Sequence, residues 1–337
     1  MTERGLPVDV VAAAAEGPLV EQVPAKARLV DLESKRVVRS LSPLIGYLRR
    51  ERPRVVVSSM GHANLVALWA ARLAPGETPV VVTVHNTMSQ STPQQGWTAS
   101  LWPHLLRTFY PWASAVVAVS RGAADDLAAS TGLRRDRVEV VYNPVITPEM
   151  LAQARRPPDH PWFAAGQPPV VVGVGRLTRQ KDFPTLLRAF AEIRRGRAIR
   201  LMILGEGEER AALEALAREL GVAEDVALPG FRADAIACMA RAAVFVLSSA
   251  WEGLPTVLIE ALAVGAPVAS TDCPSGPREI LQDGRLGALV PIGDSSALAR
   301  AMIDAVDRPR GPVPEEALRP FTRDAAVDHY LRLIETA

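Results

Sequence analysis

Cysteine is nearly absent from this chain of 337 residues, which contains two, Cys238 and Cys273. Two cysteines cannot build a disulfide framework, and a reduced, cytoplasmic setting fits them. The formal net charge is close to zero, at +1, so composition gives no electrostatic case for nucleic acid. No uncharged apolar run reaches the ~18–20 residues that span a bilayer, and the N-terminus, with charges at Glu3, Arg4 and Asp9, shows no signal-peptide core. The sequence therefore predicts a cytoplasmic globular protein.

Apolar residues make up 48% of the chain, which is ample for large cores, and the length predicts two domains. Short apolar runs alternate with amphipathic segments, a pattern typical of parallel sheets with helices on both faces. The expected strands cover residues 8–12, 54–57, 79–84, 115–119, 138–141, 169–174, 199–204, 226–228, 244–247, 267–270 and 288–290.

A proline-rich stretch between residues 143 and 169 has no sustained periodicity and is interpreted as a linker. It separates an N-terminal Rossmann-like domain, residues 1–145, from a C-terminal one, residues 169–320, with the linker itself at 146–168. A last helix is expected over residues 321–334.

Two carboxylates stand eight positions apart, Glu252 and Glu260, directly after the apolar strand 244–247. Pro255 suits the first turn of a helix, which is expected to run through Glu260 to Gly265. The N-terminus of such a helix, beside a strand end of an open α/β sheet, is a site for phosphate. A glutamate pair of this spacing also arises by chance, so its flanking strand and helix carry the interpretation.

Two cations follow another strand end. Arg176 comes two residues after the run 170–174, and Lys181 lies five residues later, before an expected helix cap at Asp182. An arginine fork and a lysine point charge suit a diphosphate, and such charge stabilises a nucleoside diphosphate as it leaves. Without the flanking strand and helix, the alternative interpretation is that Arg176 and Lys181 are solvated loop residues with no role in binding. Gly173 and Gly175 do not complete a dinucleotide-binding fingerprint.

Together these motifs resemble the retaining glycosyltransferases of family 4, and the string 272–280 resembles those that build bacterial surface polysaccharides. The resemblance implies the α/β GT-B fold, in which two Rossmann-like doubly wound domains face a cleft and a last helix, 321–337, crosses back onto the first domain. It also implies retaining transfer of a hexose from a nucleotide-sugar, UDP-linked, to a glycan or lipid-linked acceptor. No cofactor is expected, and with no Asp-x-Asp motif evident no metal is expected either.

The resemblance also implies roles for individual residues. Glu260 would hold the ribose diol, and Glu252 the sugar or the charge beside it. Arg176, Lys181 and the helix N–H groups around Thr256 would hold the diphosphate. His85, after the strand 79–84, would touch the donor sugar or the acceptor, with a purely structural role as the alternative. The other donor-binding positions carried over are Gly175, Gly205, Glu206, Phe231, Arg232, Gly253, Leu254, Pro255 and Val257.

The front of the chain departs from the family. Its first expected strand, 8–12, resembles the family's second strand, so the opening β–loop–α unit is expected to be missing from this chain and present in a longer gene product. Loss of a central strand should expose apolar strand edges. Two rival functions stay open: a GT-B sugar-nucleotide epimerase and a non-catalytic nucleotide-sugar binding protein.

One aromatic segment leaves a choice between a core and a surface. Trp102, Leu105, Leu106 and Phe109 share a helix face, which predicts a core-facing helix. The alternative is a surface for a lipid-linked acceptor and peripheral contact with the inner membrane, helped by arginines earlier in the chain. These arginines are Arg49, Arg50, Arg52 and Arg54.

Overall fold

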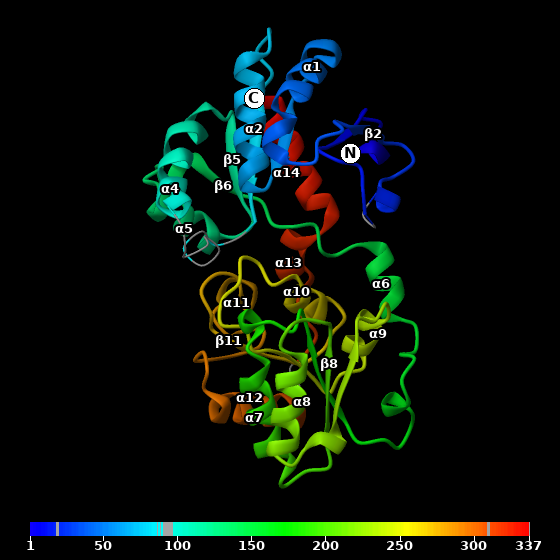
Figure 1. Ribbon diagram of the computed structural model, residues 1–337. Helices are drawn as coiled ribbons and strands as arrows, with labels where there is room; N and C mark the ends of the chain where they lie inside the picture. Colours follow the sequence, from blue (N-terminus) through cyan, green and yellow to red (C-terminus); the bar gives the residue numbers. More distant parts are fainter. Residues whose placement is uncertain (18–19, 86, 88, 90–96, 309–310, 337) are drawn as a thin grey trace. The chain divides into compact units, whose positions relative to one another are not determined.

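The computed structural model describes residues 1–17, 20–85, 87, 89, 97–308 and 311–336, which divide into two compact units (Figure 1). Unit 1 comprises Met1–Val119, Ala123–Val141 and Val327–Ala337. Unit 2 comprises Ser120–Gly122 and Tyr142–Ala326. The last helix, α14 (Arg323–Thr336), therefore begins in unit 2 and continues in unit 1.

Within its described residues, unit 1 has two parallel sheets, one of two strands and one of four. The first pairs β1 (Asp9–Ala12) with β2 (Arg28–Asp31). The second has the order β3 (Val56–Ser59), β4 (Val80–Val84), β5 (Ala115–Ala118), β6 (Val138–Val140). In the four-stranded sheet β3 is an edge, and Val57 on it is 43% exposed. The α-helices described in unit 1 are α1 (Leu41–Glu51), α2 (Gly61–Leu73), α4 (Trp97–Phe109), most of α5 (Arg121–Thr131) and the greater part of α14.

Successive side chains of the four-stranded sheet point to opposite faces, so they pack into two separate cores. Val80 and Val82 pack with α2, α4 and α5 on one face. Val81 packs on the other face against Tyr330 and Leu333 of α14. Both faces of the two central strands, β4 and β5, are buried, which explains why these strands are largely apolar runs.

Unit 2 has one six-stranded parallel sheet among the residues described. Its spatial order is β12 (Ala288–Val290), β11 (Val268–Thr271), β10 (Val244–Leu247), β7 (Val170–Val174), β8 (Arg200–Leu204), β9 (Val226–Gly230). The chain starts in the middle at β7, runs outward to β9, then returns to β10 on the other side. The strand order thus reverses between β7 and β10, and ligands of doubly wound sheets bind at the carboxyl ends of strands beside such a reversal.

Helices cover both faces of this sheet. Leu186 and Phe190 of α7 pack with Leu298 of α12 against one face, together with strand residues such as Val171. Helices α9 and α10 contact β7 and β10. Besides the start of α14, the α-helices described in unit 2 are α6 (Pro148–Ala154), α7 (Phe183–Arg194), α8 (Arg210–Glu219), α9 (Ala235–Ala240), α10 (Thr256–Ala263), α11 (Pro277–Ile280), α12 (Ser295–Asp307) and α13 (Glu315–Leu318).

The eleven strands expected from the sequence are all present, each within about two residues of its expected bounds. The sequence pattern did not predict β2, a four-residue strand with exposed ends. It also missed α6, which lies inside the stretch interpreted as a linker and buries Met150. A signal for α6 was available, because Thr147 caps its first turn and Pro148 begins it.

The core interpretation of the aromatic helix is confirmed. Leu106 is buried, and Trp102, Leu105 and Phe109 pack against the same core as α2 and β4. None of the described helices combines the length and the apolar character that a bilayer crossing requires.

Candidate functional site

The strand reversal in unit 2 brings the two charged motifs together. The loop after β7 carries Arg176 and Lys181, and the loop after β10 carries Glu252. Lys181 Nζ lies 2.6 Å from Glu252 Oε1, and both side chains are largely buried, at 15% and 7% exposed. Positions 71 residues apart in sequence are therefore one ion pair at the edge of the sheet where ligands bind.

Glu252 is held from several sides. Ser249 Oγ donates to its Oε1 at 2.6 Å, and Gln180 Nε2 approaches its Oε2 at 3.4 Å. Gln180 also donates to the Trp251 carbonyl at 3.0 Å, and its own carbonyl accepts from Ala250 N–H at 2.8 Å. A buried carboxylate needs such donors, because an unpaired charge away from water is costly. The arrangement fixes Glu252 and the lysine that faces it.

Helix α10 begins just after this pair. Pro255 occupies the N-cap position, one residue before the helical position expected for it, and the helix ends at Ala263 rather than near Gly265. No side chain caps the helix start at Thr256. Free N–H groups and the positive end of the helix dipole favour an anion at such a position.

Glu260 lies on α10, one turn beyond Thr256, and is half-buried. Burial raises the pKa of its carboxyl group. No hydrogen bond or ion pair joins its side chain to another part of the described chain. A desolvated carboxylate without a donor is poorly satisfied in the free protein and suits hydroxyl donors of a ligand.

The loop after β11 holds the Glu252–Pro255 segment in place. The Pro274 carbonyl accepts from Glu252 N–H at 3.3 Å, and Ser275 Oγ donates to the Gly253 carbonyl at 2.7 Å. Gly276, with φ of 98°, stands so close to Pro255 that a Cβ would come within 2.3 Å of the proline Cδ. Only glycine fits there, which the sequence alone does not indicate.

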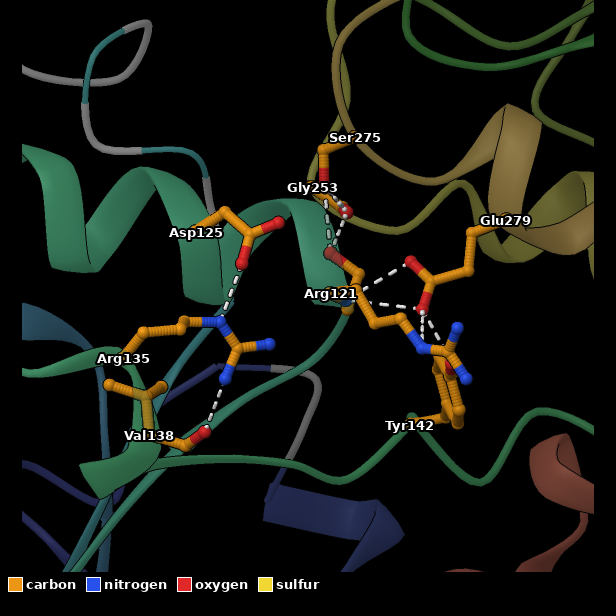
Figure 2. A network of polar contacts seen from close by, with 9 residues as sticks. Arg121, Asp125, Arg135, Val138, Tyr142, Gly253, Ser275 and Glu279 are labelled. Carbon is orange, nitrogen blue, oxygen red and sulfur yellow. Dashed lines mark hydrogen bonds and ion pairs between the residues drawn. The ribbon is translucent and has the colours of Figure 1, made fainter.

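Residues 120–122 add to the same network. Ser120 Oγ donates to the Gly253 carbonyl at 2.8 Å and lies 2.7 Å from Ser275 Oγ. Figure 2 shows the Glu279 carboxylate between Arg121 and Tyr142. The Arg121 N–H donates to both of its oxygens, at 3.1 and 3.0 Å, and the Tyr142 hydroxyl donates to one. Gly253, beside Glu252, is thus fixed by hydroxyls from two separate segments.

The second expected cation has no such network. Arg176 is exposed, and its guanidinium makes no hydrogen bond or ion pair with the described residues. Gly175 before it leaves room for the Lys181 stem, since a Cβ would lie 2.9 Å from Lys181 Cε. Gly205, with φ of 140°, lies against the Gly175 carbonyl. Its lack of a side chain allows the loops after β7 and β8 to come close together. Arg176 could therefore bind a ligand without breaking a contact within the described chain, whereas Lys181 is already paired with Glu252.

The remaining expected donor positions are partly engaged by the protein itself. Glu206 forms an ion pair with Arg210 at 2.7 Å, and this hydrogen bond lowers the pKa of Glu206. Arg232 pairs with Asp234 at 2.8 Å and donates to the Asp159 carbonyl at 2.7 Å. Phe231 is 84% exposed.

His85 follows β4 in unit 1, at the carboxyl end of that strand. His85 is exposed as a whole residue, and desolvation by the surrounding chain lowers the pKa of its imidazole. His85 Nε2 lies 3.2 Å from Thr83 Oγ1. Among the residues that the structure describes, this is the one side chain that partners a ring nitrogen of His85.

The two cysteines are buried, and burial raises the pKa of Cys238 to about 11 and that of Cys273 to about 12. Neither is a nucleophile at neutral pH, because the thiolate is the reactive form. Within the described ranges, no cluster of three or more His, Cys, Asp or Glu side chains is placed to hold a metal ion.

Comparison with known proteins gives matches to both units. Residues 1–148 match the family model described as Glycosyltransferase Family 4, and residues 168–308 match the model described as Glycosyl transferases group 1. Lipopolysaccharide core biosynthesis glycosyltransferase LpsE of Rhizobium meliloti (strain 1021) is 36% identical over 209 residues. That match covers 60% of this chain and 59% of LpsE, so it spans less than two thirds of the relative.

Two further matches cover more of both chains. The N-acetylgalactosamine-N,N'-diacetylbacillosaminyl-diphospho-undecaprenol 4-alpha-N-acetylgalactosaminyltransferase of Campylobacter jejuni is 28% identical over 287 residues, 85% of this chain and 73% of that protein. The crystal structure of Anabaena HepE in complex with UDP-glucose superposes with a TM-score of 0.77 at 22% identity, covering 97% of this chain and 90% of HepE. At that identity the likeness to HepE concerns the fold.

Proposed function

Because this chain belongs to the glycosyltransferases, with a family 4 domain followed by a group 1 domain in the GT-B fold, we propose that it moves a hexose from a UDP-linked donor to a glycan or lipid-linked acceptor in polysaccharide biosynthesis. The observation that carries the proposal is the buried Lys181–Glu252 pair at the strand reversal of unit 2. The names of the relatives support the acceptor class, and the UDP-glucose bound to HepE supports the donor.

The donor diphosphate would be bound by three features of unit 2. Arg176 supplies a bidentate fork, Lys181 a compact positive charge, and the start of α10 at Thr256 its N–H groups. Their charge is directed at the bond that breaks, where a nucleoside diphosphate leaves with growing negative charge. Glu260 would accept from the two ribose hydroxyls, which replaces the donors that its buried carboxylate lacks.

Transfer with retention would place attack and departure on one face of the sugar. The acceptor oxygen forms the new bond to the anomeric carbon while the bond from that carbon to the phosphate oxygen breaks. The acceptor proton passes to the departing phosphate oxygen, so no enzyme nucleophile is consumed. Glu252, already paired with Lys181, would hold the sugar and balance the charge beside it. The cations Arg176 and Lys181 would take the part of a metal ion.

Mass spectrometry of the products tests this function directly. The protein is incubated with a panel of nucleotide-sugars, with and without an acceptor extract. A glycosyltransferase adds one hexose to an acceptor molecule and releases the nucleoside diphosphate. An epimerase would convert the donor without acceptor, and a binding protein would leave all reactants unchanged. Either of these two results contradicts the proposal.

A further inference from the structure

The ends of strands β3 and β4 in unit 1 carry a small polar cluster around one hydroxyl group. Thr83 is 1% exposed, and its Oγ1 lies near three polar atoms. These are the Ser58 carbonyl at 3.0 Å, Ser59 Oγ at 2.7 Å and His85 Nε2 at 3.2 Å. Ser58 and Ser59 come from β3, which pairs in parallel with β4 through the register Ser59 to Thr83.

Each of the three contacts requires a proton, and counting the protons leaves one assignment. A carbonyl oxygen cannot donate, so the single Thr83 proton must lie on the bond to Ser58. Ser59 must then donate its own hydroxyl proton to Thr83. The last proton must come from His85 Nε2, which fills the second lone pair of Thr83 Oγ1. Any other arrangement leaves two acceptors facing each other at a buried atom, which is unfavourable.

The network therefore selects one tautomer of His85. In a neutral imidazole one ring nitrogen carries the proton and donates, and the other nitrogen accepts. The hydrogen-bond partner of the ring decides which nitrogen carries the proton. With the proton on Nε2, the Nδ1 atom is an acceptor. No described residue donates to it.

We propose that Thr83 is a positioning residue that fixes the Nε2–H tautomer of His85, so that Nδ1 accepts a hydrogen bond from a hydroxyl group of a bound sugar. The role of the sugar rests on the proposed function, whereas the tautomer rests on unit 1 alone. Thr83 itself touches no ligand and acts through the histidine.

The backbone around Thr83 is held independently of its hydroxyl. Asn64 is fully buried, and its Nδ2 donates to the Thr83 carbonyl at 2.9 Å and to the Tyr110 hydroxyl at 3.1 Å. Strand β4 is also hydrogen-bonded to β3 and β5. Substitution of the Thr83 hydroxyl is therefore expected to leave the strand end in place.

Nitrogen-15 NMR of the histidine rings tests the tautomer. The chain has five histidines, and His85→Asn assigns the His85 signals by their loss. In the wild type we expect protonated Nε2 and unprotonated Nδ1. Thr83→Val, which keeps the shape and removes the hydroxyl, should give a mixture of tautomers. Thr83→Ser should restore the single tautomer. Ser59→Ala is the matched control, since it removes a donor to Thr83 and leaves the bonds from His85 and to Ser58.

Two results overturn the role of Thr83. One is a wild-type His85 protonated on Nδ1. The other is a Thr83→Val protein that stays folded and keeps the wild-type tautomer. Neither measurement needs a substrate, so a chain that transfers no sugar would count against the proposed function and leave the NMR result standing.

Substitutions of His85 test which nitrogen meets the sugar. Asn places an acceptor oxygen where Nδ1 lies, and Gln places its polar atoms where Nε2 lies. We expect His85→Asn to retain about five- to tenfold more transfer activity than His85→Gln, the worth of roughly one hydrogen bond. Equal or reversed activities would refute the use of Nδ1. Comparing KM for donor and for acceptor in His85→Gln shows which of the two carries the hydroxyl.

Discussion

At the scale of single residues, Arg176 and Lys181 share an expected role but differ in their surroundings. Removing either cation should lower turnover by about 100-fold, by analogy with the loss of one preorganised charge stabiliser. Lys181→Met should also cost about 3–5 kcal/mol in the free energy of unfolding, because it leaves the buried Glu252 charge unpaired. Turnover and urea unfolding, measured on the same preparations, check both expectations.

Arg176→Ala serves as the matched comparison. Its side chain is exposed, so the free energy of unfolding should change by no more than ~0.5 kcal/mol while turnover falls. A stable Lys181→Met protein with normal turnover would contradict the importance of the ion pair. If both cations serve one diphosphate, the double variant should lose less than the sum of the single losses.

Glu260 is expected to lower the stability of the free protein while contributing to binding of the donor. Burial raises its folded-state pKa, so the charged form is disfavoured in the native state. The contribution of the neutral Glu260 carboxyl to the free energy of unfolding is therefore fully present below the unfolded-state pKa. This contribution is lost as the pH rises through the raised folded-state pKa. Glu260→Gln should unfold at a higher temperature than the wild type at pH 7, and the difference should vanish near pH 4. Thermal unfolding across this pH range measures it, and a variant less stable than wild type at pH 7 would refute the argument.

The residue pattern of the site could be predicted from sequence only in part. The charge spacing and the strand ends indicated that Arg176, Lys181, Glu252 and Glu260 belong to one region of unit 2. The direct pairing of Lys181 with Glu252 could not be predicted, because it depends on the strand order that places β7 beside β10. Thr83 and Gly276 could not be predicted either, because the contacts that single them out, with Ser59 and with Pro255, come from other elements.

At the scale of elements, the loop before α10 is held by close packing that a single methyl group would disturb. A Cβ on Gly122 would lie 2.8 Å from Ser275 Oγ and 2.9 Å from Ser275 Cα. Backbone cannot yield as a side-chain tip can, so Gly122→Ala should displace Ser275 and the Gly253 carbonyl that it holds. We expect a fall in turnover of roughly 10- to 100-fold, since a displacement of about 1 Å can cost that much.

Gly196→Ala is the control for that substitution, since an added Cβ there meets nothing within 4 Å. Steady-state kinetics of the two variants, with the fold checked by circular dichroism, gives the answer. Equal turnover in Gly122→Ala and Gly196→Ala would show that the packing around Ser275 does not position the donor loop.

Elements were predicted well where burial gives a clear period and poorly where it does not. Strands β7 and β10 are buried on both faces and appear in the sequence as continuous apolar runs. Helix α6 buries only Met150, so it leaves no period to detect. Strand β2 is poorly buried, and its first and last residues are exposed. Tertiary partners, rather than local preference, decide such elements.

At the scale of the whole molecule, the two units differ in their sheets. In the described parts of the chain, unit 2 has a single sheet with β7 in its middle, whereas the strands of unit 1 form two separate sheets. A missing central strand predicts exposed strand edges in the first domain, and Val57 on the edge strand β3 is 43% exposed. The expectation of a longer gene product stays a prediction.

Transfer should continue when divalent metal ions are removed. Lys181 and Arg176 already place positive charge where the diphosphate would bind, so the leaving group is stabilised by side chains. Activity measured with excess EDTA is expected to stay within about twofold of the untreated enzyme. Loss of activity that magnesium or manganese restores would show that a metal ion takes part.

The central claim is that unit 2 binds a nucleotide-sugar at the end of β10. Calorimetric titration of a panel of nucleotide-sugars into the wild-type protein and Glu260→Ala tests it most directly. One UDP-sugar should bind the wild type, and loss of charge-assisted hydrogen bonds worth about 1.5–3 kcal/mol each should weaken it by roughly 10-fold or more in the variant. The claim is contradicted if no member of the panel binds the wild type, or if folded Glu260→Ala binds the same sugar nucleotide equally well.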